Sequence, residues 1–297
     1  MKEYINTVII PTTCKAERRE SLLAAIESIA KQEGLVSKIL IVINGSVYDA
    51  DLNQVIQKLP NTELVFSKNA NLALAIEYGR SLVQTKYFSF LDDDDKYIEN
   101  TLLTRVSRLE EDASIDVLVT NGYDVSNGEQ ALRVKDPAIV NRDPLTALMD
   151  YNWLASCGGM FRLATVTNEY FKKPIKYYEW TTIAFRVSGE LNVVFVDTPT
   201  YCVNDTSVSL SKSAGYIIAS ESIIRMMLAS DKSQKIRKTL NSKLSSVLHT
   251  MADFYRHNNN LTSAWYYHIK SLFFIGGYRY LAYTRKLLYT FFKTDRK

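Results

Sequence analysis

Residues 87–95 read Tyr87-Phe88-Ser89-Phe90-Leu91-Asp92-Asp93-Asp94-Asp95, an apolar run that ends in four consecutive aspartates. The apolar part is short, rich in aromatic residues and flanked by polar ones, which is typical of a buried strand. Clustered carboxylates repel one another, and a fold tolerates them most readily when a cation lies among them. Mg²⁺ and Mn²⁺ commonly bind one or two carboxylates together with substrate phosphates. Because open α/β sheets bind ligands at the carboxyl ends of their strands, this run predicts a metal–diphosphate site.

Most acidic runs are solvated surface, and that simpler explanation has to be weighed first. This run follows an apolar strand rather than a polar linker. It also lacks the glycine and the distant glutamate of a helix–loop–helix calcium site. The surrounding sequence therefore has to decide between the two explanations.

Composition narrows the classes of protein. A chain of 297 residues is long enough for one large domain, or for one domain with an appendage. The three cysteines are far apart, which fits a reducing compartment and gives no metal-ligand spacing. All three histidines lie at or after His249, which excludes a histidine-built catalytic centre in the first two thirds. We expect no targeting signal before the first strand and no membrane-spanning segment.

The first half of the chain alternates apolar strands with amphipathic helices. Strands are expected at 7–10, 38–43, 64–66, 87–91 and 116–120, and helices at 18–33 and 71–84. Pro11 is expected to end the first strand, and Gly34 to end the first helix. This alternation predicts a parallel sheet covered by helices on both faces. A further helix near 181–187 and a strand at 192–196 are expected in the less regular region that follows.

Beyond about residue 213 the strand patterns stop. Long helical patterns run through residues 217–228, 233–255 and 262–274. We therefore predict two parts, an α/β domain over residues 1–212 and an all-helical C-terminal region over residues 213–297.

Six segments follow one another in a characteristic order and spacing. They are Val8-Ile9-Ile10-Pro11-Thr12, Asn44-Gly45-Ser46, Asn69-Ala70-Asn71 with Tyr78-Gly79, the aspartate run, Ser156-Cys157-Gly158-Gly159-Met160-Phe161-Arg162, and Tyr201-Cys202-Val203-Asn204 with Ser207 and Ser209. Together they resemble family 2 glycosyltransferases, which have the GT-A fold. The resemblance covers about residues 5–211 and implies a Rossmann-type, mixed but mostly parallel sheet flanked by helices. It also implies that a sugar moves from a nucleotide-diphosphate donor to a hydroxyl group with inversion.

The resemblance further implies roles for single residues. Asp92 and Asp94, in the family's Asp-x-Asp motif, would hold Mn²⁺ or Mg²⁺, and the ion would neutralise the leaving diphosphate. A share of this work for Asp93 or Asp95 stays open. Asn204 stands where the family often has a histidine near the metal, so we assign it to the metal site. The residues expected to contact the donor nucleotide are Pro11, Thr12, Glu17, Asn44, Asn71, Asp92 and Asp93. The family often has an aspartate before the Gly-Ser turn, and that aspartate recognises uracil. This chain has Ile43-Asn44 there, so the identity of the donor's nucleobase stays open.

An inverting displacement needs a general base, because a sugar hydroxyl is a poor nucleophile near neutral pH. The family usually has Glu-Asp at the start of a helix that later carries an arginine. This chain has Glu179-Trp180, followed by Arg186. Counting back from Arg186 puts Trp180 in place of the aspartate, whereas a shift of one residue makes Trp180 a sugar-stacking aromatic. Glu179 is the predicted base, and its structural alternative is a carboxylate that offsets the helix macrodipole.

The last thirty residues are aromatic and basic, and Asp295 is their only acidic residue. Such a segment suits the headgroup layer of an anionic membrane. The alternative is that these helices pack on the catalytic domain or on a second copy, giving a homo-oligomer. We expect no nucleic-acid partner, because the basic residues are confined to the tail.

The expected activity is metal-dependent, inverting transfer of a hexosyl or N-acetylhexosaminyl group, with a UDP-sugar as the favoured donor. The expected acceptor is a glycan or a lipid-linked sugar of bacterial surface polysaccharide synthesis, at the cytoplasmic face of the cell membrane. A nucleotidyltransferase is one alternative. Such an enzyme usually has a glycine-rich phosphate-binding loop near the first strand, and residues 11–20 contain no glycine. The other alternative is a non-catalytic nucleotide-sugar-binding protein that keeps the fold but has lost its base.

Overall fold

The computed structural model describes residues 4–204, 214–230 and 233–294. The chain divides into two compact units, Met1–Ser207 and Val208–Lys297, and each is described by itself. The predicted domain boundary at residues 212 and 213 lies outside the described residues, as do Ser207 and Ser209.

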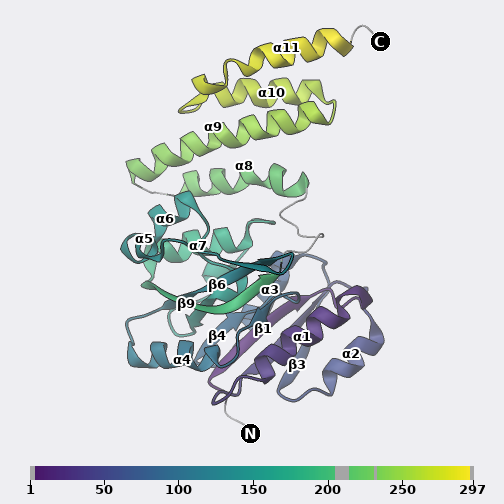
Figure 1. Ribbon diagram of the computed structural model, residues 1–297, viewed down its shortest axis with the longest axis vertical. Coiled ribbons are helices and arrows are strands. Elements are labelled where there is room, and N and C mark those ends of the chain that lie inside the picture. The colour runs from purple at the N-terminus through teal and green to yellow at the C-terminus, as the bar shows by residue number, and fades with distance from the viewer. Residues whose placement is uncertain (1–3, 205–213, 231–232, 295–297) are drawn as a thin grey trace. The chain divides into compact units, whose positions relative to one another are not determined.

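The N-terminal unit is built on one nine-stranded sheet with the order β3-β2-β1-β4-β8-β6-β9-β5, and β7 pairs with β6 (Figure 1). Strands β3, β2, β1 and β4 are parallel, whereas β8 runs antiparallel to both of its neighbours. The strands are β1 Asn6–Thr12, β2 Lys38–Asn44, β3 Thr62–Ser67, β4 Tyr87–Phe90, β5 Lys96–Tyr97, β6 Val117–Ser126, β7 Glu129–Leu132, β8 Gly159–Arg162 and β9 Val193–Asn204. The helices are α1 Arg19–Ala30, α2 Ala50–Gln57, α3 Leu72–Ser81, α4 Thr101–Glu111, α5 Pro137–Arg142, α6 Pro144–Asp150 and α7 Glu179–Glu190.

The side chains of β1 point alternately to the two faces of the sheet, and helices cover both faces. Val8 and Ile10 belong to a buried cluster that includes Leu22 of α1 and Leu52 of α2. Ile9 points to the opposite face, where α3 packs so closely that a Cβ added at Gly79 would lie 2.7 Å from the Ile9 Cγ2 atom. A strand that is buried on both faces reads as a continuous apolar run, as this one does.

The first strand does not end at Pro11 as predicted but continues through Thr12. The carbonyl of Ile9 accepts a hydrogen bond from the N–H of Leu91, which directly follows β4. Because strand residues alternate with a period of two, the backbone nitrogen of Pro11 also faces β4. Pairing with β4 ends at Ile9 and Phe90. The missing N–H of Pro11 therefore leaves no ladder bond unmade, and the strand tolerates the proline.

Helix α1 ends at Ala30, earlier than the predicted Glu33. Gln32 leaves the helical path, and its side-chain oxygen accepts bonds from the backbone N–H groups of Thr101 and Leu102 at the start of α4. The side chain of Gln32 thus caps a second helix, which satisfies two N–H groups that have no partner within α4.

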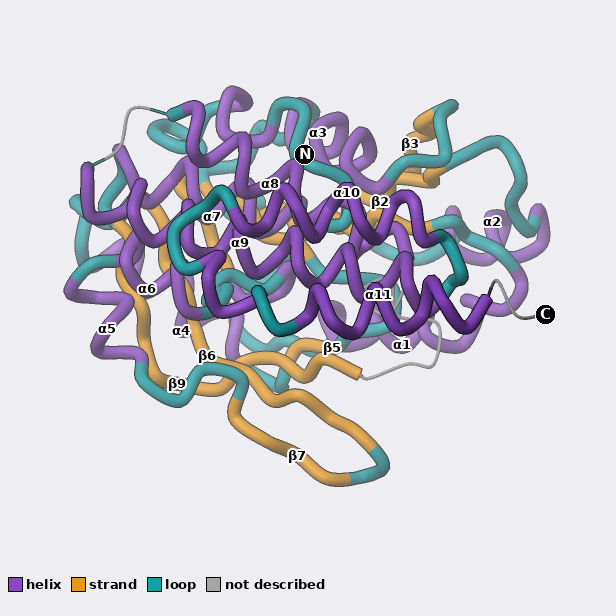
Figure 2. The backbone as a smooth tube through the Cα atoms, turned by 90° about the horizontal axis from the view of Figure 1, so that it is seen from above, coloured by secondary structure: helices purple, strands orange, loops and turns teal. Residues whose placement is uncertain are grey.

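The β6–β7 hairpin extends well beyond the neighbouring strands (Figure 2). Its turn contains Asn127 and Gly128, whose φ angles of 52° and 83° are both positive. Two such residues form the tight turn whose twist matches that of a β-hairpin. The strand was predicted to end at Thr120, but it continues to Ser126 and into this turn.

The C-terminal unit contains the helices α8 Ala214–Ala229, α9 Gln234–His257, α10 Leu261–Leu272 and α11 Tyr283–Thr294. Its core includes Leu240, Leu244 and Leu248 of α9, which recur at helical spacing and are fully buried. Gly276, with φ at 82°, and a short 3₁₀ helix at Gly277–Tyr280 separate α10 from α11. None of the helices in the described parts of the chain has the length and apolarity needed to cross a membrane.

Candidate active site

The four aspartates form a turn at the carboxyl end of β4. The N–H of Asp95 donates to the carbonyl of Asp92 at 3.2 Å, so the run folds back on itself. Asp93 and Asp95 are buried, whereas Asp92 and Asp94 remain partly exposed. The turn therefore presents alternate carboxylates, Asp92 and Asp94, toward solvent.

The inner carboxylate of the turn, Asp93, is bound by the last residue of β1 and by a residue that follows this strand. The hydroxyl of Thr12 donates to Asp93 at 2.5 Å, and the guanidinium of Arg18 contacts Asp93 at 3.2 Å and Asp94 at 2.8 Å. Because β1 and β4 are parallel neighbours, their carboxyl ends place Thr12 beside the aspartate turn. Thr12 was predicted as a site residue, whereas Arg18, which provides an internal counter-ion, was not.

The turn is also tied to the end of β9. The backbone N–H of Asn204 donates to a carboxylate oxygen of Asp95 at 3.0 Å, and its side-chain amide donates to the carbonyl of Asp94 at 2.5 Å. The structure thus places Asn204 against the aspartates, with its amide nitrogen occupied by the backbone. Its predicted role as a metal ligand stays a prediction.

Burial and mutual repulsion disfavour the charged forms of two carboxylates in this turn. Asp92 retains some solvent contact, yet burial raises its pKa to about 7, and the charges of Asp94, Asp93 and Glu179 add to the shift against the hydrogen bond from Ser156. Burial likewise raises the pKa of Asp95 to about 8, and the charge of Asp92 adds to it. Carboxylates that resist ionisation in this way are sites where a cation is favoured.

Glu179 is the first residue of α7 and is only 5% exposed. The structure gives it no ion pair among the residues that it describes, and burial raises the pKa of its carboxyl group above the usual 4.5. The next residue, Trp180, packs edge-on against Phe90 with ring centroids 5.0 Å apart. Since Phe90 lies two residues before Asp92, this contact holds the start of α7 beside the aspartate turn.

An aromatic cluster fixes that contact. Phe88 stacks on Phe161 at 5.0 Å, and Phe90 stacks on Phe171 at 5.6 Å. The indole of Trp180 therefore belongs to this cluster, which accounts for an aromatic residue beside the predicted base. Its alternative role, stacking on a sugar, stays a prediction.

Asn44, the last residue of β2, lies against Asn71, the residue that precedes α3. The side-chain oxygen of Asn44 accepts a bond from the N–H of Asn71 at 2.6 Å, and Asn71 in turn caps α3 through the N–H of Ala73. Both side chains therefore stabilise the start of α3, and their contact with the nucleotide stays a prediction. Pro11 lies buried within β1, and Glu17 is exposed in the 3₁₀ turn Ala16–Arg18.

The donor set fits a hard divalent ion. Within the described residues, no group of three His, Cys, Asp or Glu side chains is arranged to hold a metal. A Mg²⁺ or Mn²⁺ site that uses substrate phosphates needs only one or two carboxylates from the protein, and Asp92 and Asp94 supply two. Burial disfavours the charged form of Asp92, and a cation beside it would favour that form, which is the structural reason that a cation fits.

Arg18 offers a test of this charge balance. In EDTA, Arg18→Gln should lower the free energy of unfolding by about 1–2 kcal/mol, because two partly buried carboxylates lose their counter-ion. Mn²⁺ should recover more stability in this variant than in the wild type, as measured by urea unfolding. Arg19→Gln is the matched control, because Arg19 pairs with Asp49 at a more exposed position. An equal effect of Mn²⁺ on both variants would contradict a cation at this turn.

Comparison with known proteins decides the family. The model of Glycosyl transferase family 2 matches residues 7–171, which is more than half of the chain. The chain belongs to this family. The match includes Thr12, Arg18 and the aspartate turn, and it ends before Glu179. The family predicted from the sequence is confirmed.

Solved structures share the fold of this family 2 glycosyltransferase. The structure of S. aureus TarS residues 1–349 in complex with UDP-GlcNAc has a TM-score of 0.58 and 16% identity, covering 86% of this chain and 75% of that chain. A longer S. aureus TarS structure has a TM-score of 0.58 and 15% identity, covering 84% of this chain and 48% of that chain. At such identity the likeness concerns the fold alone, and it confirms the predicted GT-A-like α/β class. No curated protein sequence matches the chain.

Proposed function

We propose that this glycosyltransferase moves a sugar from a nucleotide-diphosphate donor to an acceptor hydroxyl, with inversion and with dependence on Mn²⁺ or Mg²⁺. The observation that carries the proposal is the buried carboxylate of Glu179, which has no ion pair among the described residues, beside a turn in which Asp92 and Asp94 are partly exposed. One group suits proton removal, and the other two suit the donor diphosphate.

Asp92 and Asp94 would hold the divalent ion at the carboxyl end of β4. When bound, the ion supplies positive charge that offsets the charge developing on the leaving diphosphate. Thr12 and Arg18 keep Asp93 inside the turn, and Asn204 keeps Asp95 there. These bonds orient the two exposed carboxylates before the donor arrives.

Glu179 would act on the acceptor. Its carboxylate takes the proton of the acceptor hydroxyl as that oxygen attacks the anomeric carbon, and the bond to the diphosphate breaks on the opposite side. Burial keeps water from solvating the carboxylate, which raises its pKa and makes it a stronger base.

The donor is proposed to be a UDP-sugar that carries a hexose or an N-acetylhexosamine. The family and the similarity of fold to a TarS structure that contains UDP-GlcNAc support this choice. The acceptor is proposed to be a glycan or lipid-linked sugar of bacterial surface polysaccharide synthesis, met at the cytoplasmic face of the membrane.

A panel of nucleotide sugars tests the donor. With Mn²⁺, one UDP-sugar at about one hundred times its dissociation constant should stabilise the protein by about 2.7 kcal/mol, seen as a rise of several degrees in Tm. EDTA should remove most of that rise, because the carboxylates then repel the diphosphate. GDP- and dTDP-sugars at the same concentration are the controls for the base. Failure of every nucleotide sugar to raise Tm with Mn²⁺ present would refute the proposal.

A further inference from the structure

Exposed hydrophobic side chains gather in the connection between α10 and α11. Phe273 is 83% exposed, Tyr278 74% and Leu281 58%, and Ile275 between them is 45% exposed. Soluble proteins rarely expose so many large apolar groups within nine residues without an interaction to serve. We call these four residues the apolar tip.

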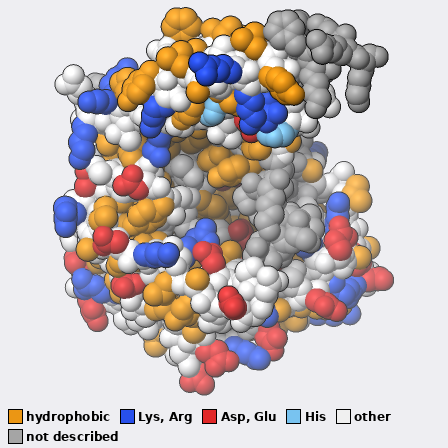
Figure 3. Space-filling model, turned by 45° about the horizontal axis from the view of Figure 1, so that its top comes forward, with side chains coloured by type: hydrophobic (Ala, Val, Ile, Leu, Met, Phe, Trp, Pro, Cys, Tyr) orange, Lys and Arg blue, Asp and Glu red, His pale blue; other side chains and the backbone are white. Residues whose placement is uncertain are grey.

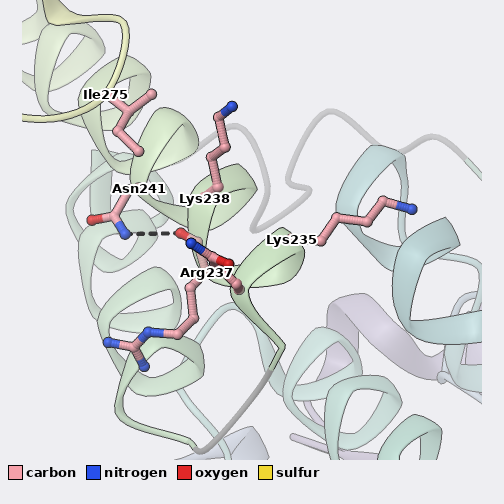
Figure 4. Close-up of a pocket in the computed structure, with 6 residues that line it drawn as sticks. Lys235, Arg237, Lys238, Asn241 and Ile275 are labelled. Atoms are coloured by element: carbon pink, nitrogen blue, oxygen red, sulfur yellow. Dashed lines mark hydrogen bonds between the residues drawn. The ribbon is translucent and has the colours of Figure 1, made fainter.

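Basic side chains surround the apolar tip. Ile275 lines a shallow groove together with Lys235 and Lys238 from the start of α9, and Figure 4 shows the three side chains. Arg279 donates to the hydroxyl of Ser242 on α9 at 3.3 Å, which fixes its guanidinium on the same side. Lys235, Lys238 and Arg279 are exposed, and we call them the basic rim.

Little negative charge offsets this surface. Asp253 is the only acidic residue between positions 233 and 294 of the sequence. Its carboxylate is already bound by Arg256 at 3.0 Å and by the hydroxyl of Tyr283 at 2.8 Å. On the C-terminal unit, Figure 3 shows hydrophobic and basic side chains side by side. Among the described residues of α9, α10 and α11, no acidic side chain therefore neutralises the basic rim.

We propose that the apolar tip and the basic rim dock this protein on the surface of an anionic lipid bilayer. Aromatic and aliphatic side chains of the tip enter the boundary between headgroups and acyl chains, and the lysines and arginine of the rim contact the anionic headgroups. The proposal does not depend on the proposed transfer reaction, because docking is measured without donor or acceptor.

Two features favour a bilayer over other occupants. Lys235 and Lys238 extend in different directions (Figure 4), so they do not converge on one small anion but suit charge that is spread over a surface. A second copy of this chain would place one basic rim against another in a two-fold interface, and the like charges would repel. A bilayer offers the apolar layer and the negative charge together.

Vesicle flotation of the full chain tests the proposal. The wild type should bind phosphatidylcholine vesicles that contain 30% phosphatidylglycerol about two orders of magnitude more tightly than pure phosphatidylcholine, because each of the three rim residues contributes about fivefold. Lys235→Gln with Lys238→Gln should weaken binding about fivefold for each lysine. Phe273→Ser with Tyr278→Ser should weaken binding to both kinds of vesicle. All four positions are exposed, so thermal unfolding of the variants should match the wild type.

Matched controls lie on the N-terminal unit. Lys172→Gln with Lys173→Gln removes two exposed charges there, and Leu132→Ser removes an exposed apolar side chain. Both controls should float like the wild type. Equal flotation of wild-type and tip variants would overturn the proposal. So would absence of flotation combined with binding to RNA, or with a concentration-dependent dimer that the tip variants abolish.

Discussion

Asp94→Asn should reduce the rate of sugar transfer by about 10²–10⁴-fold, and Asp92→Asn should have an effect of similar size. Each change removes a charged oxygen ligand from the proposed cation, whose neutralisation of the leaving diphosphate is worth several kcal/mol in the transition state. The measurement is release of nucleoside diphosphate together with transfer to acceptor, at saturating Mn²⁺. Titration with UDP should show that the dependence of UDP binding on Mn²⁺ is lost as well.

The control for these variants is Asp51→Asn, which changes an exposed carboxylate in the first turn of α2. It should leave transfer and UDP binding unchanged. If Asp92→Asn and Asp94→Asn both keep wild-type turnover at low Mn²⁺, the turn does not hold a catalytic ion. In that outcome the carboxylates serve the structure alone, through their bonds to Thr12, Arg18 and Asn204.

Glu179→Gln should lower transfer by about 10²–10⁴-fold while it leaves binding of the donor nearly intact. Glutamine keeps the size of the side chain but cannot accept the proton of the acceptor hydroxyl. The measurements are kcat for transfer and the dissociation constant for UDP with Mn²⁺. Glu190→Gln, at the exposed end of the same helix, is the matched control and should keep full activity. Wild-type turnover in Glu179→Gln would remove this residue as the base.

The pH profile gives a second test of the same residue. Burial raises the pKa of Glu179, so its proton is held to a higher pH than the usual 4.5. The active carboxylate form is therefore lost on acidification at a pH above that value, and kcat/KM should fall there. Glu179→Gln should abolish this acid limb, whereas Glu190→Gln should retain it.

Local sequence patterns predict much of the fold. The continuous apolar runs of β1, β2 and β4 and the amphipathic stripe of α1 predicted a sheet covered on both faces, since burial on two sides leaves no polar position. The errors have local causes as well. Pro11 was expected to end β1, because proline cannot donate a ladder hydrogen bond. The strand continues because its pairing with β4 has already stopped at Ile9 and Phe90, which the sequence does not reveal. The β6–β7 hairpin was missed although Asn127-Gly128 is a strong turn signal.

The candidate site also has features that local sequence predicts and features that depend on tertiary packing. Local sequence was enough to predict the family, the aspartate run after a buried strand, and Glu179 at the start of a helix, because each depends on neighbours along the chain. The contacts of Arg18 with Asp93 and Asp94, and of Trp180 with Phe90, depend instead on how distant segments pack. Residues separated by 75 or 90 positions meet through sheet order and aromatic packing, which no periodicity in a single sequence records.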